Sequence, residues 1–135
     1  MTDPAAPLST ELFIRRFGET LLATAAPLFE QAALNAREAG LQAMAHTAGN
    51  PPELCLEVKA ADQPYASHYR ISADTARQCV EHALYFVADG TTRTLEGGLD
   101  SINSMVVDTQ LATLLRDGFG VKLPTVEARH PAGFW

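Results

Sequence analysis

The stretch that decides the fold is residues 13–40, FIRRFGETLLATAAPLFEQAALNAREAG. Its apolar residues recur at spacings of three, four and seven, the period of a helix that buries one face. This stripe consists of Phe13, Phe17, Leu21, Leu28, Ala32, Ala36 and Ala39. Ser9 is suited to the N-cap, and Gly40 to the left-handed residue just past a helix C-terminus. The pattern predicts one long amphipathic helix.

Pro27 lies inside this helix. A proline removes one backbone donor and crowds the carbonyl four residues earlier, which costs about 3 kcal/mol in a helix interior. Either the helix kinks between Ala23 and Pro27, or two helices meet with Pro27 in the first turn of the second. Because the stripe continues past Pro27, we expect one kinked helix.

The second half of the stripe has small residues on its buried side. Small residues let a helix approach its neighbour closely, which has two interpretations. Tight packing on a sheet is favoured, because burying one face is the usual reason for amphipathicity. The alternative is a helix–helix dimer seam, which makes Ala32 and Ala36 candidate partner-binding residues.

After Gly40 the period changes from helical to two, which predicts strands. Alternating residues indicate strands at 41–46, 54–59, 65–71 and 80–86, separated by turns at 48–52 and 61–64. Asp89-Gly90 predicts a tight hairpin that leads into a return strand at 91–95. Short turns between successive strands predict an antiparallel meander.

The segment Thr75–His82 is ambiguous, since it fits a strand or a short helix capped by Asp74. We prefer the strand, because residues 84–87 are rich in aromatic and β-branched side chains and lead into the hairpin. If Ala73 pairs with Ala76, His82 lies opposite Ser67 on the apolar face. If Ala73 pairs with Arg77, His82 lies opposite His68 on the outer face. Burial favours the first register, since each large apolar side chain gains about 1.5–3 kcal/mol when buried.

A second amphipathic helix is predicted from Met105 to Phe119, capped by Ser101 or Ser104 and closed by Gly118 and Gly120. The predicted fold is therefore α+β: a long kinked N-terminal helix packed on an antiparallel meander of about four to five strands, with a C-terminal helix, in a two-layer sandwich. We expect a flexible N-terminus over 1–8, one α+β domain over 9–123 and an irregular tail over 124–135.

Composition excludes some classes of partner. The chain has 135 residues and a net charge of −6, so no nucleic acid and no anionic membrane surface is expected as a partner, because both bind through clustered Lys and Arg. No apolar stretch reaches the roughly 20 residues needed to span a bilayer. The start of the chain lacks the features of a secretion signal, so a cytoplasmic location is expected. Cys55 and Cys79 are expected to be small packing residues without a disulfide.

His82 is the candidate catalytic residue, as a general base in a half-buried pocket. The same pocket, lined by Tyr65, Ser67, Tyr69 and His82, is the candidate ligand-binding site. The structural alternative, a core histidine bonded to a hydroxyl and a backbone group, is favoured because His82 has no partner at a catalytic spacing.

We expect no metal and no cofactor. A metal site from His68 and His82 requires the disfavoured register and further ligands. Gly97-Gly98 is interpreted as a simple turn, since no phosphate-binding spacing accompanies it. Asp108 is expected on the solvated face of the second helix.

The end of the chain combines cations and aromatic residues: Arg129, His130, Phe134 and Trp135. Exposed aromatics at a chain end are unfavourable unless they dock. They either fold back on the protein or bind a partner, where Trp and Arg are favoured anchors. Arg129, Phe134 and Trp135 are therefore candidate partner-binding residues.

The sequence predicts a non-enzymatic protein-interaction module: an adaptor, a chaperone-like carrier or a neutralising partner that self-associates as a homodimer. Small size, acidic charge, the alanine-faced helix and the aromatic tail favour it. The alternatives are a small-ligand binder and an enzyme that uses His82.

Overall fold

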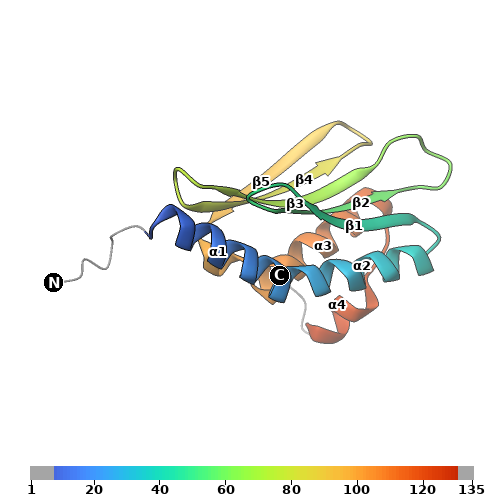
Figure 1. Ribbon diagram of the computed structural model, residues 1–135. Coiled ribbons are helices and arrows are strands. Elements are labelled where there is room, and N and C mark those ends of the chain that lie inside the picture. The colour runs from blue at the N-terminus through green and yellow to red at the C-terminus, as the bar shows by residue number, and fades with distance from the viewer. Residues whose placement is uncertain (1–7, 131–135) are drawn as a thin grey trace.

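Helices cover one face of a five-stranded antiparallel sheet (Figure 1). The computed structural model describes residues 8–130. The helical elements are α1 (Thr10–Thr20), the π-helical turn η1 (Leu21–Ala25), α2 (Ala26–Glu38), the 3-10 turn η2 (Leu99–Ser101), α3 (Ser104–Phe119) and α4 (Pro124–Arg129). The strands are β1 (Gln42–Ala48), β2 (Glu53–Lys59), β3 (Ser67–Asp74), β4 (Cys79–Phe86) and β5 (Thr91–Gly97). The predicted α+β class, long N-terminal helix, antiparallel meander and C-terminal helix are confirmed.

The N-terminal helix runs without a break through α1, η1 and α2. Ser9 caps it as predicted, and its Oγ accepts from the N–H of Leu12 at 3.1 Å. In η1 the N–H of Ala26 donates to the carbonyl of Leu21, so this turn holds one residue more than an α-helical turn. Pro27 follows in the first turn of α2, where a missing N–H is tolerated. The wide turn thus lets one helix continue past the proline.

The extra residue in η1 changes which residue faces the core just after it, whereas Ala32 and Ala36 keep their predicted buried positions. The buried residues are Phe13, Phe17, Leu21, Ala25, Phe29, Ala32, Ala33 and Ala36. The predicted stripe was wrong at Leu28, which is half-buried, and at Ala39, which is exposed. Phe29 takes the core position that was expected for Leu28.

The sheet has the order β1-β2-β3-β4-β5, so every strand pairs with its neighbour in sequence. Thr75–His82 is not a helix: a turn at residues 75–78 precedes β4. Both predicted registers were wrong, because Ala73 pairs with Val80 and His82 lies opposite Ile71. The turn is longer than expected, and Gln78 in it has a positive φ of 51°. The favoured register differs by four residues, an even number, so it placed His82 correctly on the core face.

The helix layer buries the apolar sheet face, which carries Leu54, Leu56, Val58, Tyr69, Ile71, Val80, Leu84 and Phe86. α2 runs along β1. Ala32 and Ala36 are 1% and 0% exposed within the single chain. They therefore cannot form the dimer seam, and tight packing of α2 inside the fold explains the small residues.

α3 is capped by Asn103, whose Oδ1 accepts from the N–H of Val106 at 2.9 Å, rather than by Ser101 or Ser104. Gly120 ends it in the left-handed conformation at φ 67°. An irregular tail was expected over residues 124–135. This was wrong for Pro124–Arg129, which forms α4. A proline in the first helical turn costs no hydrogen bond and presets φ, and Val126 anchors α4 in the core.

At the other end, the backbone of Leu8 is bonded in both directions to the side chain of Gln78. The rest of the expected N-terminal segment lies outside the described residues. Among residues 8–130, no helix has the length and apolar character to cross a membrane.

Candidate functional site

His82 lies in the core and is 1% exposed. Its Nδ1 is 2.6 Å from the hydroxyl oxygen of Tyr69, and its Nε2 is 3.0 Å from Oγ of Ser101. Ser101 Oγ in turn donates to the carbonyl of Gly98 at 2.7 Å. Since the Ser101 proton is used on Gly98, His82 Nε2 must donate to Ser101, and Nδ1 then accepts from Tyr69. The result is a directed chain of hydrogen bonds that joins β3, β4 and η2.

This environment keeps His82 neutral. Burial lowers the pKa of His82 to about 4, and burial raises the pKa of Tyr69 well above its usual range. A general base needs a free nitrogen within reach of a substrate proton. Both ring nitrogens of His82 are already bonded inside the core, which is the arrangement of a structural histidine.

The other residues of the predicted pocket do not converge on His82. Ser67 is 2% exposed, and its Oγ accepts from the N–H of Val87 at 3.0 Å. Tyr65 lies on the β2–β3 connection and is 71% exposed. Of the predicted set, the structure brings together Tyr69 and His82.

His68 and His82, which were considered above as a possible pair of metal ligands, lie on opposite faces of the sheet. His68 lies opposite Glu57 and Tyr85, on the sheet face that carries no helix, whereas His82 faces the core. The His68 ring packs on Tyr85 with centroids 5.2 Å apart. Burial and then Arg70 lower the pKa of His68.

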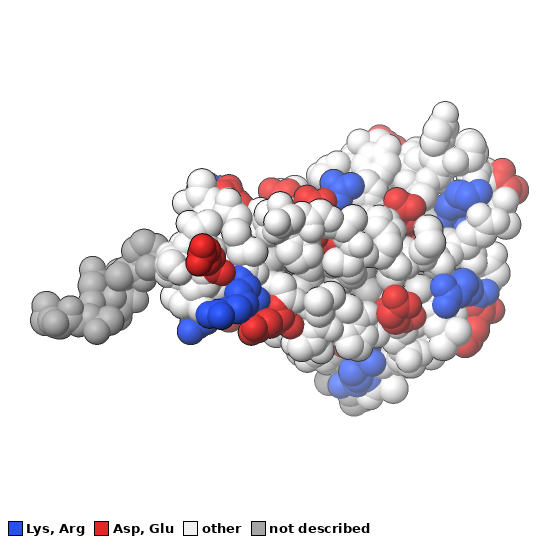
Figure 2. All heavy atoms as spheres, in the orientation of Figure 1, with Lys and Arg blue, Asp and Glu red and all other residues white. Residues whose placement is uncertain are grey.

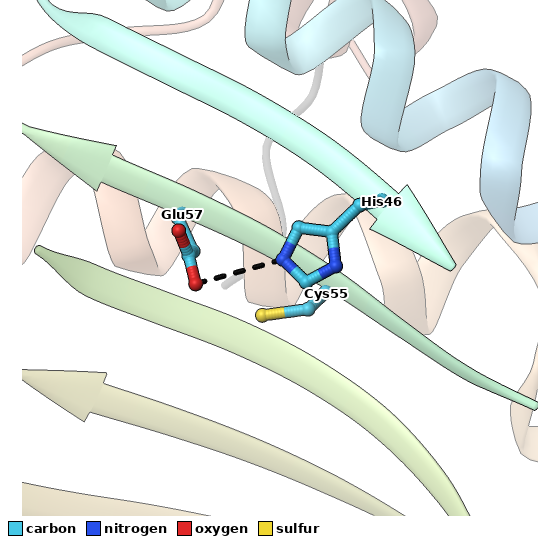
Figure 3. A group of neighbouring side chains, drawn as sticks. All are labelled: His46, Cys55 and Glu57. Atoms are coloured by element: carbon cyan, nitrogen blue, oxygen red, sulfur yellow. Dashed lines mark ion pairs between the residues drawn. The ribbon is translucent and has the colours of Figure 1, made fainter. Parts of the chain in front are cut away.

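Three donor side chains meet on this outer sheet face: His46 of β1, and Cys55 and Glu57 of β2 (Figure 3). Each offers a donor atom within 4.8 Å of the other two. Nε2 of His46 is 3.5 Å from Oε1 of Glu57, and both side chains are nearly half exposed. Cys55 lies between them and is 5% exposed.

Strand pairing explains the cluster. His46 lies directly opposite Cys55, and Glu57 is two residues further along β2, so all three side chains share one face. Alternation along the predicted strand at 54–59 is enough to put Cys55 and Glu57 on one face. It did not give the β1–β2 register, which depends on a turn at residues 49–52 and decides that His46 joins them.

Arg70 of β3 lies opposite Cys55 on the other side, and its Nε is 3.8 Å from Oε2 of Glu53. Burial raises the pKa of the Cys55 thiol, and the nearby Arg70 guanidinium opposes that shift. Beside Glu57 a hollow of about 300 Å³ opens, lined by Gln42, Ala43, Met44, Glu57, Lys59 and Ala66. One edge of the cluster is therefore accessible from this hollow.

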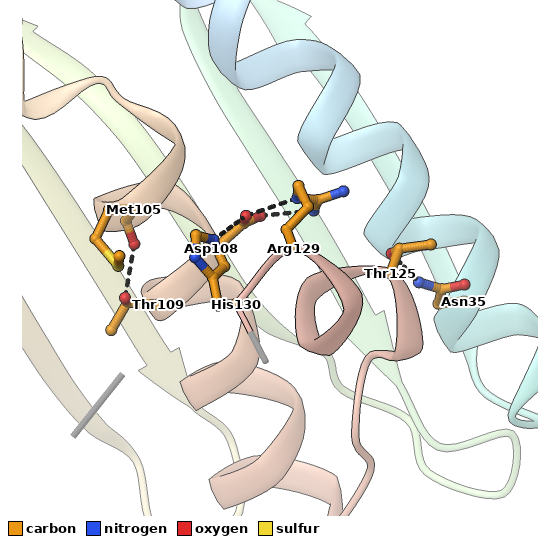
Figure 4. A network of polar contacts seen from close by, with 7 residues as sticks. All are labelled: Asn35, Met105, Asp108, Thr109, Thr125, Arg129 and His130. Atoms are coloured by element: carbon orange, nitrogen blue, oxygen red, sulfur yellow. Dashed lines mark hydrogen bonds and ion pairs between the residues drawn. The ribbon is translucent and has the colours of Figure 1, made fainter. Parts of the chain in front are cut away.

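The C-terminal part forms a second polar cluster (Figure 4). Asp108 of α3 is fully buried rather than on a solvated face. Its two carboxylate oxygens accept from Nε and Nη2 of Arg129, each at 2.8 Å. His130 Nε2 is 2.8 Å from the same carboxylate. The predicted solvated position was wrong because α4 and His130 cover this face of α3.

Arg129 therefore bonds within its own chain, and the Asp108 carboxylate raises its pKa. On the far side of α4, Thr125 accepts a hydrogen bond from the amide of Asn35 on α2. α4 is thus held between α2 and α3. The predicted partner-binding residues Phe134 and Trp135 lie outside the described residues.

These three groups, around His82, Cys55 and Asp108, are the clusters of polar side chains described for residues 8–130. Compared with protein-family models, curated proteins and solved structures, the chain has no match.

Proposed function

We propose that the protein is a non-enzymatic interaction module that self-associates as a homodimer, and that β5 is its pairing surface. The observation that carries this proposal is the exposure of β5. All its residues from Thr91 to Glu96 are exposed, on both faces of the strand. Leu95, on the core-facing side, is 41% exposed.

The two edges of the sheet differ. At β1 the edge is partly blocked, since α2 runs along it and Nη1 of Arg37 donates to the carbonyl of Ala43 at 2.9 Å. β5 pairs with β4 along one side, and Arg93 ties it to the helix layer through an ion pair with Asp117 of α3 at 3.0 Å, which leaves its other backbone edge uncovered (Figure 1). An unblocked edge strand offers a row of backbone donors and acceptors to another strand. β5 is therefore the better site for adding a strand.

A second copy of β5 fits this edge without charge conflict. With a two-fold axis at Thr94, antiparallel pairing puts Thr94 opposite the partner's Thr94 and Arg93 opposite the partner's Leu95. Thr92 then faces the partner's Glu96. No like charges lie opposite each other, and such pairs would be destabilising. Two five-stranded sheets would join into one, with the symmetric contact usual in homodimers.

The face shown in Figure 2 has no patch of one charge sign that would attract a basic partner. The net charge is −6, but on the face in Figure 2 acidic and basic side chains are interspersed. A mixed surface gives weaker steering of a charged partner than a patch of one sign.

The test is the solution mass by size-exclusion chromatography with light scattering. Wild type is expected at twice the chain mass of 14.5 kDa. Thr94→Lys places two lysines opposite each other at the two-fold axis, so the mass should fall to that of one chain. Thr94 is exposed, so the fold should tolerate the change.

Met44→Lys is the matched control, because Met44 is 58% exposed on the outer face of the opposite edge strand. It should leave the mass unchanged. A wild type that stays monomeric at high micromolar concentration contradicts the homodimer. A Thr94→Lys protein that stays dimeric contradicts the β5 interface.

A further inference from the structure

We propose that His46, Cys55 and Glu57 form a zinc-binding site on the outer face of the sheet. The imidazole, thiolate and carboxylate that these residues supply are the three ligand types that proteins use for Zn²⁺. They come from two paired strands, so the backbone of the β1–β2 ladder fixes their spacing.

The present distances are close to those of a zinc site. Tetrahedral zinc with bonds of about 2.0–2.3 Å requires ligand atoms roughly 3.3–3.7 Å apart. His46 Nε2 and Glu57 Oε1 are already 3.5 Å apart, and all three donor atoms lie within 4.8 Å of one another. The remaining closure needs side-chain rotation, which the half-exposed His46 and Glu57 side chains can make.

The charges also favour a divalent ion. With a neutral imidazole, the Cys55 thiolate and the Glu57 carboxylate together balance the charge of Zn²⁺. Softer thiolate and borderline imidazole ligands favour zinc over magnesium or calcium, which prefer oxygen ligands. Arg70 lies opposite Cys55 and can donate a hydrogen bond to a metal-bound thiolate without entering the ligand set.

Three protein ligands leave the fourth tetrahedral position to water or to a small ligand. The hollow beside Glu57, with a volume of about 300 Å³, adjoins the cluster. The site is therefore of the open kind and is accessible from solvent.

The test uses untagged, reduced, chelator-treated protein. It is titrated with Co²⁺ and followed by absorption spectroscopy, and separately titrated with Zn²⁺ and followed by calorimetry. Wild type should bind one ion per chain and show the sulfur-to-cobalt charge-transfer band of a thiolate ligand. Cys55→Ser should abolish that band and weaken Zn²⁺ binding more than about 100-fold, since even a residue that only supports a metal ligand contributes about 10–100-fold.

Glu57→Gln provides a second variant, because its half-exposed side chain can change without disturbing the core. It should weaken Zn²⁺ binding while the circular-dichroism spectrum stays native. Cys79→Ser is the matched cysteine control and should bind as wild type does. The proposal is overturned if wild type gives no thiolate band, if the band survives Cys55→Ser, or if Cys79→Ser removes it.

Discussion

At the residue scale, His82 shows how a polar side chain becomes part of the core. Its two nitrogens are bonded to Tyr69 and Ser101, so its burial leaves no polar atom unpaired. Ser101 reaches it because Gly97 has no side chain: a Cβ at position 97 would lie 2.8 Å from that of Ser101. The hydrogen-bond chain therefore depends on a glycine that the sequence alone marked as a turn.

The depressed pKa of His82 makes stability depend on pH. The unfolded chain takes up a proton below about pH 6.5, whereas the folded protein does so only below about pH 4. Stability contributed by neutral His82 is therefore present above pH 6.5 and lost as the pH falls from 6.5 to 4, with little further change below. A shift of this size corresponds to about 3 kcal/mol.

The measurement is urea unfolding at a series of pH values for wild type and His82→Gln. At pH 7 the variant should be less stable by about 1–3 kcal/mol, since it loses buried hydrogen bonds. The difference in free energy of unfolding between wild type and His82→Gln should shrink as the pH approaches 4. Met44→Gln, at an exposed side chain that does not titrate, should follow the wild-type profile. Parallel curves for wild type and His82→Gln would contradict a neutral buried histidine.

At the element scale, α4 is held by polar contacts at both ends. Asn35 joins it to α2, and the Arg129–Asp108 pair joins it to α3. Removing one partner of a buried charge leaves the other uncompensated. Asp108→Asn should lower the free energy of unfolding by about 1–3 kcal/mol. Arg129→Gln should cost at least as much, since it removes two hydrogen bonds from the fully buried Asp108 carboxylate and leaves it the contact with His130.

A double-mutant cycle measures this contact directly. Asp108→Asn and Arg129→Gln should be non-additive in urea unfolding, because each removes the same pair of hydrogen bonds. The pair of Arg70 and Glu53, with both side chains about half exposed, should give a smaller coupling. Additive effects at Asp108 and Arg129 would show that the pair does not hold α4.

The sequence predicted which helices and strands form better than it predicted which of their residues face the core. Alternation and the helical period identified the long helix, the strands and the second helix, because burial of one face imposes those periods. It could not give the extra residue in η1, which moved the core position from Leu28 to Phe29, nor the length of the turn before β4. An extra residue in one helical turn leaves the apolar pattern before and after that turn intact. It changes only how the two halves of the helix are rotated relative to each other.

At the scale of the whole molecule, helices cover one face of the sheet and leave the other face and β5 open. The sequence predicted the covered face, since large apolar residues mark it. It could not predict the cluster of His46, Cys55 and Glu57, because a site assembled across strands exists only once the register is fixed. It also missed the burial of Asp108, because the covering segment lies 21 residues away in sequence.

Backbone hydrogen exchange follows from this asymmetry. The inner strands β2, β3 and β4 are each paired on both edges and covered on one face, so their amides should exchange slowest. β5 is paired to β4 alone within the chain, so the Thr94→Lys monomer should exchange quickly over residues 91–97. In concentrated wild type, pairing with a second β5 should slow the amides that point away from β4, and dilution should restore fast exchange. Equal exchange of β5 in concentrated wild type and in the variant would place self-association elsewhere on the molecule.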